Sequence, residues 1–341
     1  MKKYDVIIVG AGPAGLKCAE ILGHSGKSVL LLEKNEKIGP KVCAGGLTGK
    51  NIEYLKLPPE LVEHSYKEVV VHVNRIRKRI KWEKEFAFTI DREELGQWQL
   101  GKLNAFDNVE VRTDARVNAV TPDFIELKDE KIAYEYLVGC DGSNSVVKRY
   151  LGFTSPPAGI GLQYIIPTNK FKEFEFFFEP RYFSAWYAWI FPHRDSVSVG
   201  CGASPKYLPA KQLHRNFHDW LKFRKVDVSK GKYEAFPMNY DYHGIEFGNI
   251  FLTGDAAGLL SSFTGEGIYQ ALITGEEVAR KILDSSYQFQ KIEDILIKHT
   301  RHRRILDKLI DAGNKQTFVF LSGLFLFNFR KYKEKAIGLL G

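Results

Sequence analysis

A glycine-rich turn near the start of the chain constrains the fold more than any other segment. Residues 10–15 read Gly-Ala-Gly-Pro-Ala-Gly and directly follow the apolar run Val6–Val9. This is the pattern G-x-G-x-x-G between a predicted strand and a helix predicted over about residues 14–25. The glycines permit a tight turn and let backbone N–H groups approach a pyrophosphate at the positive end of the helix. We therefore predict an α/β fold in which a doubly wound parallel sheet binds a dinucleotide.

An acidic residue further along supports a nucleotide-binding role. Glu33 stands 18 residues after Gly15, at the end of a second strand predicted over residues 28–33. A carboxylate at this position can accept hydrogen bonds from ribose hydroxyls, and it favours an adenosine ribose without a 2′-phosphate. The residues predicted to contact the dinucleotide from this unit are Gly10, Gly12, Pro13, Ala14, Gly15, Glu33 and Lys34.

Composition narrows the classes of protein to which the chain can belong. Four cysteines (Cys18, Cys43, Cys140 and Cys201) show no C-x-x-C spacing, which argues against a disulfide framework, a zinc site or an iron–sulfur site. We predict no metal. The chain enters a strand at once, so we expect no signal peptide and a cytoplasmic protein. A net charge of +8 could attract anions or be a solvated surface, and nothing resembles a nucleic-acid module, so we expect no nucleic-acid partner.

The pattern of strands and helices predicts a Rossmann-type domain built from separate pieces of the chain. Aromatic-rich strands between residues 160 and 203 interrupt it, and a strand at residues 250–255 returns to it. The predicted division is a dinucleotide-binding domain of residues 1–66, 91–150 and 248–285, an inserted β-sheet-rich substrate domain of residues 67–90 and 151–247, and a helical C-terminal segment of residues 286–341.

Two further motifs point to FAD. Residues 140–145 read Cys-Asp-Gly-Ser-Asn-Ser and residues 254–258 read Gly-Asp-Ala-Ala-Gly. They resemble the Asp-Gly motif and the second FAD fingerprint of the p-hydroxybenzoate-hydroxylase-like flavoproteins, although Lys148 stands where that family has an arginine. The resemblance implies FAD as the cofactor and a helix N-terminus aimed at the flavin pyrimidine. It also implies FAD contacts from Arg92, Val117, Asp141, Gly142, Gly254, Asp255, Gly265, Gly267 and Ile268.

A loop and an aromatic segment extend this resemblance over roughly residues 1–285. Residues 41–47 read Lys-Val-Cys-Ala-Gly-Gly-Leu, and residues 187–192 read Tyr-Ala-Trp-Ile-Phe-Pro, with Gly200 and Gly202 following. Together they resemble the geranylgeranyl reductase family of FAD enzymes, except that Ser184 replaces the leading proline of the aromatic motif.

This resemblance implies a reductase that saturates C=C bonds of a prenyl chain on a lipid or isoprenoid, by hydride transfer from N5 of reduced FAD. Further FAD contacts would come from Lys41, Cys43, Ala44 and Gly46, and catalytic residues from Cys43, Tyr187 and Trp189. The electron donor is left open between NAD(P)H, ferredoxin and a deazaflavin.

The aromatic segment suits such a substrate on physical grounds. A prenyl chain offers no hydrogen-bonding groups, so a receptor must hold it by burial, which stabilises binding by about 0.8 kcal/mol per CH₂ group. Tyr187, Trp189 and Phe191 alternate onto one face of a strand. Aromatic strands also form ordinary β cores. Cys43 is likewise either a gatekeeper and proton source or a small apolar residue in a glycine loop.

Other flavoenzyme classes share the predicted fold. An aromatic monooxygenase would need a polar site for a phenol, and a quinone-linked electron-transfer flavoprotein would need an iron–sulfur centre from a partner. A flavin halogenase would need a W-x-W pair, whereas Trp186 and Trp189 stand three residues apart. An apolar tunnel and Lys148 favour the reductase.

The C-terminal region combines an apolar run with basic residues. Residues 318–327 are almost wholly apolar, and basic residues cluster at positions 301–304 and 330–335. Ten residues are too few to span a bilayer. The run is either a buried core helix, which we favour, or an element that touches the membrane interface beside anionic headgroups. The second alternative would place the protein peripherally on the cytoplasmic face of the membrane.

Overall fold

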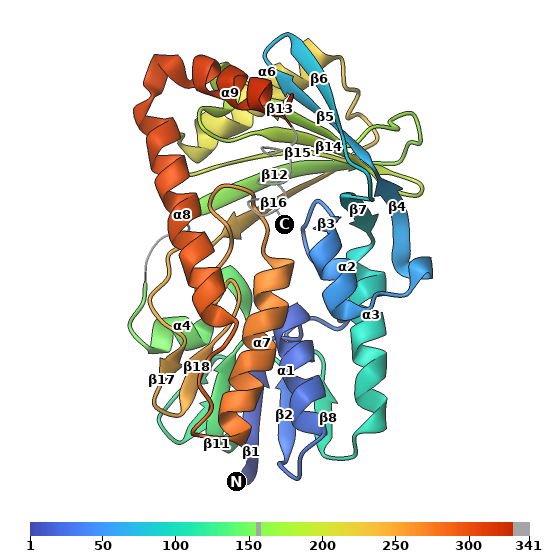
Figure 1. Ribbon diagram of the computed structural model, residues 1–341. Coiled ribbons are helices and arrows are strands. Elements are labelled where there is room, and N and C mark those ends of the chain that lie inside the picture. Colours follow the sequence, from blue (N-terminus) through green and yellow to red (C-terminus); the bar gives the residue numbers. More distant parts are fainter. Residues whose placement is uncertain (155–157, 330–341) are drawn as a thin grey trace.

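The chain folds into two large β-sheets, one above the other in Figure 1, with a small three-stranded sheet between them. The computed structural model describes residues 1–154 and 158–329. The predicted basic cluster at residues 330–335 and the end of the predicted C-terminal segment therefore lie outside the described residues.

The lower sheet has eight strands in the order β17-β18-β11-β1-β2-β8, with β9 and β10 attached beside β11. The ladder from β18 to β8 is parallel, and Ile8 at its centre lies opposite Val138 on one side and Leu31 on the other. Parallel sheets are covered on both faces, which explains the uninterrupted apolar runs of β1 and β2. The strands are β1 (Lys2–Val9), β2 (Val29–Leu32), β8 (Val109–Arg112), β9 (Ala119–Val120), β10 (Phe124–Glu126), β11 (Lys131–Gly139), β17 (Glu246–Phe247) and β18 (Ile250–Leu252).

Three helices lie side by side on the near face of this sheet in Figure 1: α1 (Pro13–Gly23), α3 (Arg92–Gly101) and α7 (Ile268–Leu283). Proline stands at the first position of α1, where its missing N–H costs nothing. Helices α1 and α7 approach so closely that a Cβ on Gly275 would lie 2.3 Å from the carbonyl oxygen of Ala14. The predicted α/β doubly wound fold is confirmed.

The upper sheet has seven strands in the order β16-β12-β15-β14-β13-β5-β6. One face is covered by α5 (Pro180–Phe183) and α6 (Ala210–Arg224), whose Phe217 and Trp220 are fully buried. Burial of each such ring is worth about 1.5–3 kcal/mol relative to exposure. The strands are β5 (Glu68–Val73), β6 (Ile76–Lys81), β12 (Gly159–Ile166), β13 (Glu175–Phe178), β14 (Ala188–Pro192), β15 (Val197–Ala203) and β16 (Lys232–Met238).

The three-stranded sheet links the two larger ones. Its strands are β3 (Gly46–Thr48), β4 (Val62–Tyr66) and β7 (Ala87–Ile90), and α2 (Gly49–Leu55) follows β3. Strand β7 pairs here, not with β5 and β6 of the upper sheet. The exact domain boundaries stay a prediction. Shorter elements are α4 (Val146–Tyr150) and 3₁₀ turns at Pro59–Leu61, Lys102–Ala105, Gly142–Asn144 and Gly313–Lys315.

Two helices follow near the C-terminus (Figure 1). Helix α8 (Ile292–Asp311) runs along the side of the molecule, and α9 (Gln316–Leu326) crosses its upper end. One side of α8 is buried through Ile292, Ile295, Leu306 and Leu309. His302, which the sequence places in a basic cluster, is also buried and hydrogen-bonds Ser261 at 2.8 Å.

The buried helix favoured for residues 318–327 is wrong. Only Gln316 and Leu324 of α9 are buried, because the apolar side chains of this helix point in all directions and only one side rests on the protein. Among residues 1–154 and 158–329, no helix is both long enough and apolar enough to cross a membrane.

Candidate active site

A single cavity of about 530 Å³ runs from the glycine-rich loop of the lower sheet to the aromatic face of the upper sheet. The structure brings most of the predicted site residues to its wall. These are Gly12, Pro13, Ala14, Lys41, Cys43, Ala44, Gly46, Arg92, Gly142, Tyr187, Trp189, Gly254, Asp255, Gly265, Gly267 and Ile268. The wall does not include Gly10, Gly15, Glu33, Lys34, Val117 or Asp141. Their predicted roles as contacts stay predictions.

The glycine-rich loop presents bare backbone to the cavity. Gly10 has φ +100°, and a Cβ on it would lie 2.6 Å from the carbonyl oxygen of Cys140, so no other residue fits there. A Cβ on Gly12 would meet nothing within 4 Å, which leaves open space beside the N-terminus of α1. A phosphate group in that space would meet backbone N–H groups and the positive end of the helix dipole.

Glu33 holds this loop in shape. Its carboxylate accepts hydrogen bonds from the backbone N–H of Ala11 and from that of Asn35, each at 3.0 Å. A carboxylate has further acceptor capacity for ribose hydroxyls. The neighbouring Lys34 is exposed, and Val117 is buried in the core of the lower sheet.

Two of the buried polar atoms that have no partner among the described residues lie close to the glycine-rich loop. They are Nε of Arg92 and Oδ1 of Asp141, whose other oxygen accepts from the backbone N–H of Val146 at 2.6 Å. Burial raises the pKa of Asp141 and outweighs hydrogen bonds from the Ser145 side chain and the Val146 backbone, which lower it. An unsatisfied buried donor or acceptor costs about 1–3 kcal/mol, so both atoms need a polar ligand. The phosphates and ribityl hydroxyls of FAD offer an acceptor to the first and a donor to the second.

The second FAD motif lies at the N-terminus of α7. Gly267 and Ile268 open the helix beside Asp255, whose carboxylate lies 3.3 Å from the ammonium group of Lys41. A 16-residue helix places partial positive charge at this end, which suits a group that becomes negative on reduction.

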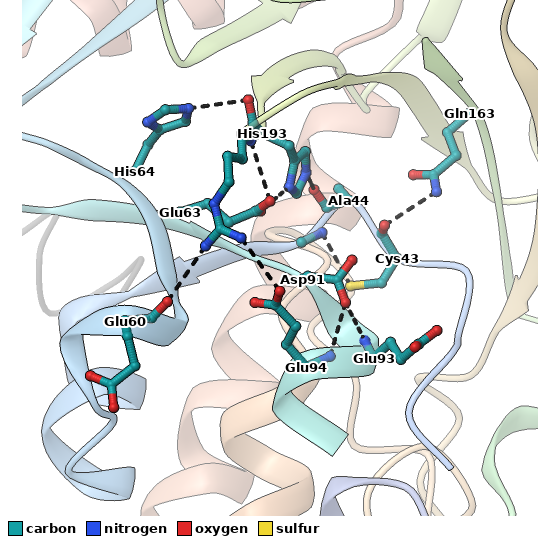
Figure 2. A network of polar contacts seen from close by, with 12 residues as sticks. Cys43, Ala44, Glu60, Glu63, His64, Asp91, Glu93, Glu94, Gln163 and His193 are labelled. Carbon is teal, nitrogen blue, oxygen red and sulfur yellow. Dashed lines mark hydrogen bonds and ion pairs between the residues drawn. The ribbon is translucent and has the colours of Figure 1, made fainter. Parts of the chain in front are cut away.

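Cys43 sits in a loop, residues 41–45, that is fixed from both sides (Figure 2) and is called the Cys43 loop below. Gln163 of β12 donates to the carbonyl oxygen of Cys43 at 3.2 Å, and Nε2 of His193 lies 3.0 Å from that of Ala44. Gly45 has φ +72°, and a Cβ on it would lie 2.4 Å from the His193 ring. The backbone of the loop is therefore held against the upper sheet, and Cys43 lies at the cavity wall with its Sγ 3.5 Å from the backbone nitrogen of Gly45.

His193 is held in turn by Glu63 of β4. Its Nδ1 hydrogen-bonds the Glu63 carboxylate, while both side chains are largely buried. Burial lowers the pKa of His193, but the hydrogen bond and negative charge of Glu63 outweigh burial and raise it. For Glu63, burial raises the pKa, and the hydrogen bond and charge of His193 outweigh that and lower it. An ion pair therefore fastens the Cys43 loop.

The aromatic wall comes from two paired strands. Phe174, Phe176 and Phe178 on or beside β13 face the cavity together with Tyr187, Trp189 and Phe191 on or beside β14. The rings of Phe174 and Phe191 stack at 3.8 Å. The predicted alternation of the aromatic segment onto one face is thus confirmed.

The polar atoms of this wall are turned toward protein partners. The Tyr187 hydroxyl donates to the carbonyl oxygen of Thr264 at 2.5 Å, and the Trp189 N–H donates to Oγ of Ser198 at 2.9 Å. Burial raises the pKa of Tyr187. Gly200 is needed beside Trp189, because a Cβ there would lie 2.3 Å from the indole ring.

Sequence reasoning missed several residues of the site. Ser198 donates to Gln163 at 3.1 Å, so one hydrogen-bonded chain joins Trp189 to the Cys43 loop. Glu266 lines the cavity and accepts from Lys50 at 2.6 Å, and Lys50 borders a second cavity of about 230 Å³. The one sequence signal for these residues is Gln163, a polar side chain within the apolar strand Gly159–Ile166.

A cavity that begins at a glycine-rich dinucleotide loop and ends among aromatic rings is typical of an oxidoreductase with a bound nucleotide cofactor. The FAD binding domain family matches residues 3–285, and the chain belongs to this family. The prediction of FAD as the cofactor is confirmed. The protein is an FAD-dependent oxidoreductase.

Relatives with similar sequences refine this class. An uncharacterized protein of Methanosarcina barkeri is 31% identical over 300 residues, covering 84% of this chain and 76% of the relative. The digeranylgeranylglycerophospholipid reductase of Methanocaldococcus jannaschii is 25% identical, covering 90% of this chain and 88% of its own. A geranylgeranyl bacteriochlorophyll reductase-like structure from Thermoplasma acidophilum shows the same fold, with a TM-score of 0.75, 20% identity and coverage of 93% and 92%. The predicted resemblance to the geranylgeranyl reductase family is confirmed, at 25% sequence identity to the archaeal reductase and 20% to the solved structure.

Proposed function

We propose that this protein saturates carbon–carbon double bonds of a prenyl chain carried by a lipid or isoprenoid. The observation that carries the proposal is the continuous cavity of about 530 Å³, with a dinucleotide loop at one end and aromatic rings at the other. Reduced FAD, when bound, supplies the hydride for one alkene carbon. The similarity to the reductase of Methanocaldococcus jannaschii supports this substrate class.

The aromatic wall suits a chain without polar groups. The hydroxyl of Tyr187 and the N–H of Trp189 are both engaged by protein acceptors, so the wall offers ring faces and edges to a ligand. A prenyl chain loses no hydrogen bonds on entering such a space and gains about 0.8 kcal/mol for each CH₂ group removed from water. A phenol, the substrate class of the aromatic monooxygenases, would lose its hydrogen bonds with water there, at a cost of about 1–3 kcal/mol.

Cys43 is the proposed proton donor. Cys43 is one of the residues that line the cavity, and the hydrogen bonds from Gln163 and His193 fix the loop backbone at Cys43 and Ala44. In the proposed step the thiol gives its proton to the second alkene carbon as the first accepts the hydride. The thiolate then regains a proton from water, so that one double bond, one hydride and one proton yield two new C–H bonds.

The test uses the FAD-loaded enzyme reduced with dithionite, which removes any dependence on the biological electron donor. A detergent-dispersed digeranylgeranyl lipid is the substrate, and mass spectrometry counts the hydrogens added. Wild-type enzyme should add two hydrogens per saturated bond. Absence of saturation in fully reduced enzyme would overturn the proposed function, and coupled consumption of oxygen, NADPH and a phenol would assign a monooxygenase instead.

The Cys43 role is tested by Cys43→Ala, with Cys201→Ala as the matched control because Cys201 is buried in the upper sheet away from the cavity. Cys43→Ala should retain FAD absorbance and lose turnover by about 100-fold or more, the usual effect of removing a proton donor. Cys201→Ala should keep its turnover. Equal turnover in Cys43→Ala and wild type would show that Cys43 is structural.

A further inference from the structure

Four neighbouring strands of the upper sheet bring one row of residues to the cavity. Trp189 of β14 lies opposite Gly200 of β15, Gly200 lies opposite Gln163 of β12, and Gln163 lies opposite Glu234 of β16. Residues directly opposite one another in an antiparallel sheet share a face. Gln163 and Trp189 both line the cavity, so this row lies on the face of the sheet that borders the site.

The missing side chain at Gly200 lets Trp189 reach across the row. A Cβ on Gly200 would lie 2.3 Å from the indole ring, so the ring occupies the space over β15. There the indole N–H donates to Oγ of Ser198, two residues earlier on β15, at 2.9 Å. Ser198 is fully buried, and its hydroxyl donates to Oε1 of Gln163 at 3.1 Å. Because a hydroxyl has a single proton, these hydrogen bonds run in one direction, from Trp189 to Gln163.

The amide of Gln163 is fully used by protein partners. Its Nε2 donates to the carbonyl oxygen of Cys43 at 3.2 Å (Figure 2) and to the carboxylate of Glu234 at 2.9 Å. A glutamine amide has two N–H donors, and both are therefore engaged. In the reverse orientation the amide oxygen would face these two acceptors, so the observed orientation is the stable one. Although Gln163 lines the cavity, its hydrogen bonds hold the protein and do not select a ligand.

We infer that Gln163 is the positioning residue for Cys43, and that Ser198 and Trp189 orient its amide. The bond from Gln163 to Cys43 joins residues 120 positions apart, so it sets where the Cys43 loop lies relative to the upper sheet. Trp189 belongs to the aromatic wall of that sheet. The consequence for catalysis rests on the proposed function: the proton donor and the wall that holds the prenyl chain are kept in one arrangement by a continuous set of hydrogen bonds.

The direct readout is the rate at which the Cys43 thiol is alkylated, which needs no substrate. Alkylation depends on access to the thiolate, and Cys43 is partly exposed whereas the other three cysteines are buried. Treatment of the FAD-loaded protein with iodoacetamide, followed by mass spectrometry of its peptides, therefore measures the Cys43 loop by itself. Cys201 is the internal control for opening of the upper sheet, because it lies opposite Leu162 on β12, the neighbour of Gln163.

Gln163→Leu removes the donor that holds the carbonyl oxygen of Cys43. It should raise the alkylation rate of Cys43 by about tenfold or more, and tenfold corresponds to about 1.4 kcal/mol. Ser198→Ala removes only the orienting hydroxyl and should raise the rate by a smaller factor, about threefold. The matched control is Tyr164→Phe, which removes a hydrogen bond to His218 from the next residue of β12, on the other face of the sheet. It should leave the rate unchanged.

A double substitution separates positioning from a direct effect on the substrate. If Gln163 acts through Cys43, Gln163→Leu should lower the turnover of wild type but should not lower the residual turnover of Cys43→Ala any further. An equal loss in both backgrounds would show that Gln163 acts on the substrate directly, and would overturn the inference.

Two alkylation results would also overturn it. The first is a wild-type rate at Cys43 in Gln163→Leu, and the second is a matching increase at Cys201, which would mean that the whole sheet has opened. A wild-type rate in Ser198→Ala would overturn the orienting role of Ser198 and Trp189. The readouts separate this inference from the proposed function. Faster alkylation in Gln163→Leu, without reductase activity in any form of the enzyme, would retain the positioning role and reject the proposed function.

Discussion

The glycine-rich loop and the Cys43 loop border the same cavity, yet different contacts give them their shapes. Residues 10–15 depend on missing side chains, since a Cβ on Gly10 or Gly15 would strike the main chain of Cys140 or Gly10, and on the Glu33 carboxylate that accepts from Ala11. The Cys43 loop is shaped by side chains of distant residues, namely Gln163 and His193. The glycine-rich end of the cavity is thus recognisable from a short stretch of sequence, whereas the Cys43 loop depends on side chains of residues far away in the sequence.

The largest expected effect falls on the glycine-rich end. In Gly15→Ala the new Cβ would lie 2.0 Å from the carbonyl oxygen of Gly10, and neither backbone segment can move without distorting the loop. We expect loss of FAD binding and a decrease of about 3 kcal/mol or more in the free energy of unfolding. FAD absorbance and urea denaturation measure both.

Gly101→Ala is the control for this substitution, since a Cβ there meets nothing within 4 Å at the end of α3. It should leave FAD binding unchanged. If Gly15→Ala retained full FAD occupancy, FAD binding would not depend on the missing side chain at position 15.

Gly200 and Gly202, the G-x-G pair of the upper sheet, offer a sharper test at the aromatic end of the cavity. A Cβ on Gly200 would lie 2.3 Å from the Trp189 indole and 2.6 Å from the carbonyl oxygen of Leu162, whereas one on Gly202 would lie 3.4 Å from a methionine methyl group. Gly200→Ala should therefore cost about 1–3 kcal/mol of stability and shift the Trp189 fluorescence, with FAD still bound. Gly202→Ala should be nearly neutral in thermal denaturation. Equal effects of the two substitutions would show that the motif does not serve to seat the indole.

These two ends also explain which parts of the site the sequence could predict. The glycine spacing and the alternation of Tyr187 and Trp189 are periodic or local signals, and the structure brings Gly12, Tyr187 and Trp189 to the cavity wall. Glu33 lies behind the glycine-rich loop, and its predicted contact with a ribose stays a prediction. The bond from Gln163 to Cys43 joins residues 120 positions apart, and that from His193 to Ala44 joins residues 149 apart, so no local pattern could reveal them. The exposure of α9 was mispredicted because apolarity reports only a preference to leave water, not what covers the helix.

The ion pair that fastens the Cys43 loop should make stability depend on pH. The pKa of Glu63 is lowered from 4.5, so its contribution is present above that value and is lost as pH falls through the lowered pKa. The pKa of His193 is raised from 6.5, so its contribution is complete below that value and is lost as pH rises through the raised pKa.

Wild type should therefore exceed Glu63→Gln in free energy of unfolding by about 1–2 kcal/mol between pH 4.5 and 6.5, and by less on either side. Chemical denaturation across a pH series measures this difference. His72→Gln is the variant with which Glu63→Gln is compared. It breaks another His–Glu pair, His72–Glu175, which lies in the upper sheet away from the Cys43 loop. A difference independent of pH would mean that the loop is held by packing and neutral hydrogen bonds.

The smallest effect is expected from Asp91, beside the cofactor end of the cavity. Substitutions there test whether this side chain does more than cap α3. Asp91 caps α3 by accepting from the backbone N–H groups of Glu93 and Glu94 at 2.7 and 2.9 Å, one residue before Arg92 at the cavity wall. Asp91→Ala should cost about 1 kcal/mol, and Asp91→Asn, which keeps an acceptor, should cost less. Because the cap also fixes the direction from which Arg92 enters the cavity, FAD should dissociate faster from Asp91→Ala than from Asp91→Asn in stopped-flow fluorescence. Equal dissociation rates would separate the cap from the cofactor and leave Arg92 positioned by the fold alone.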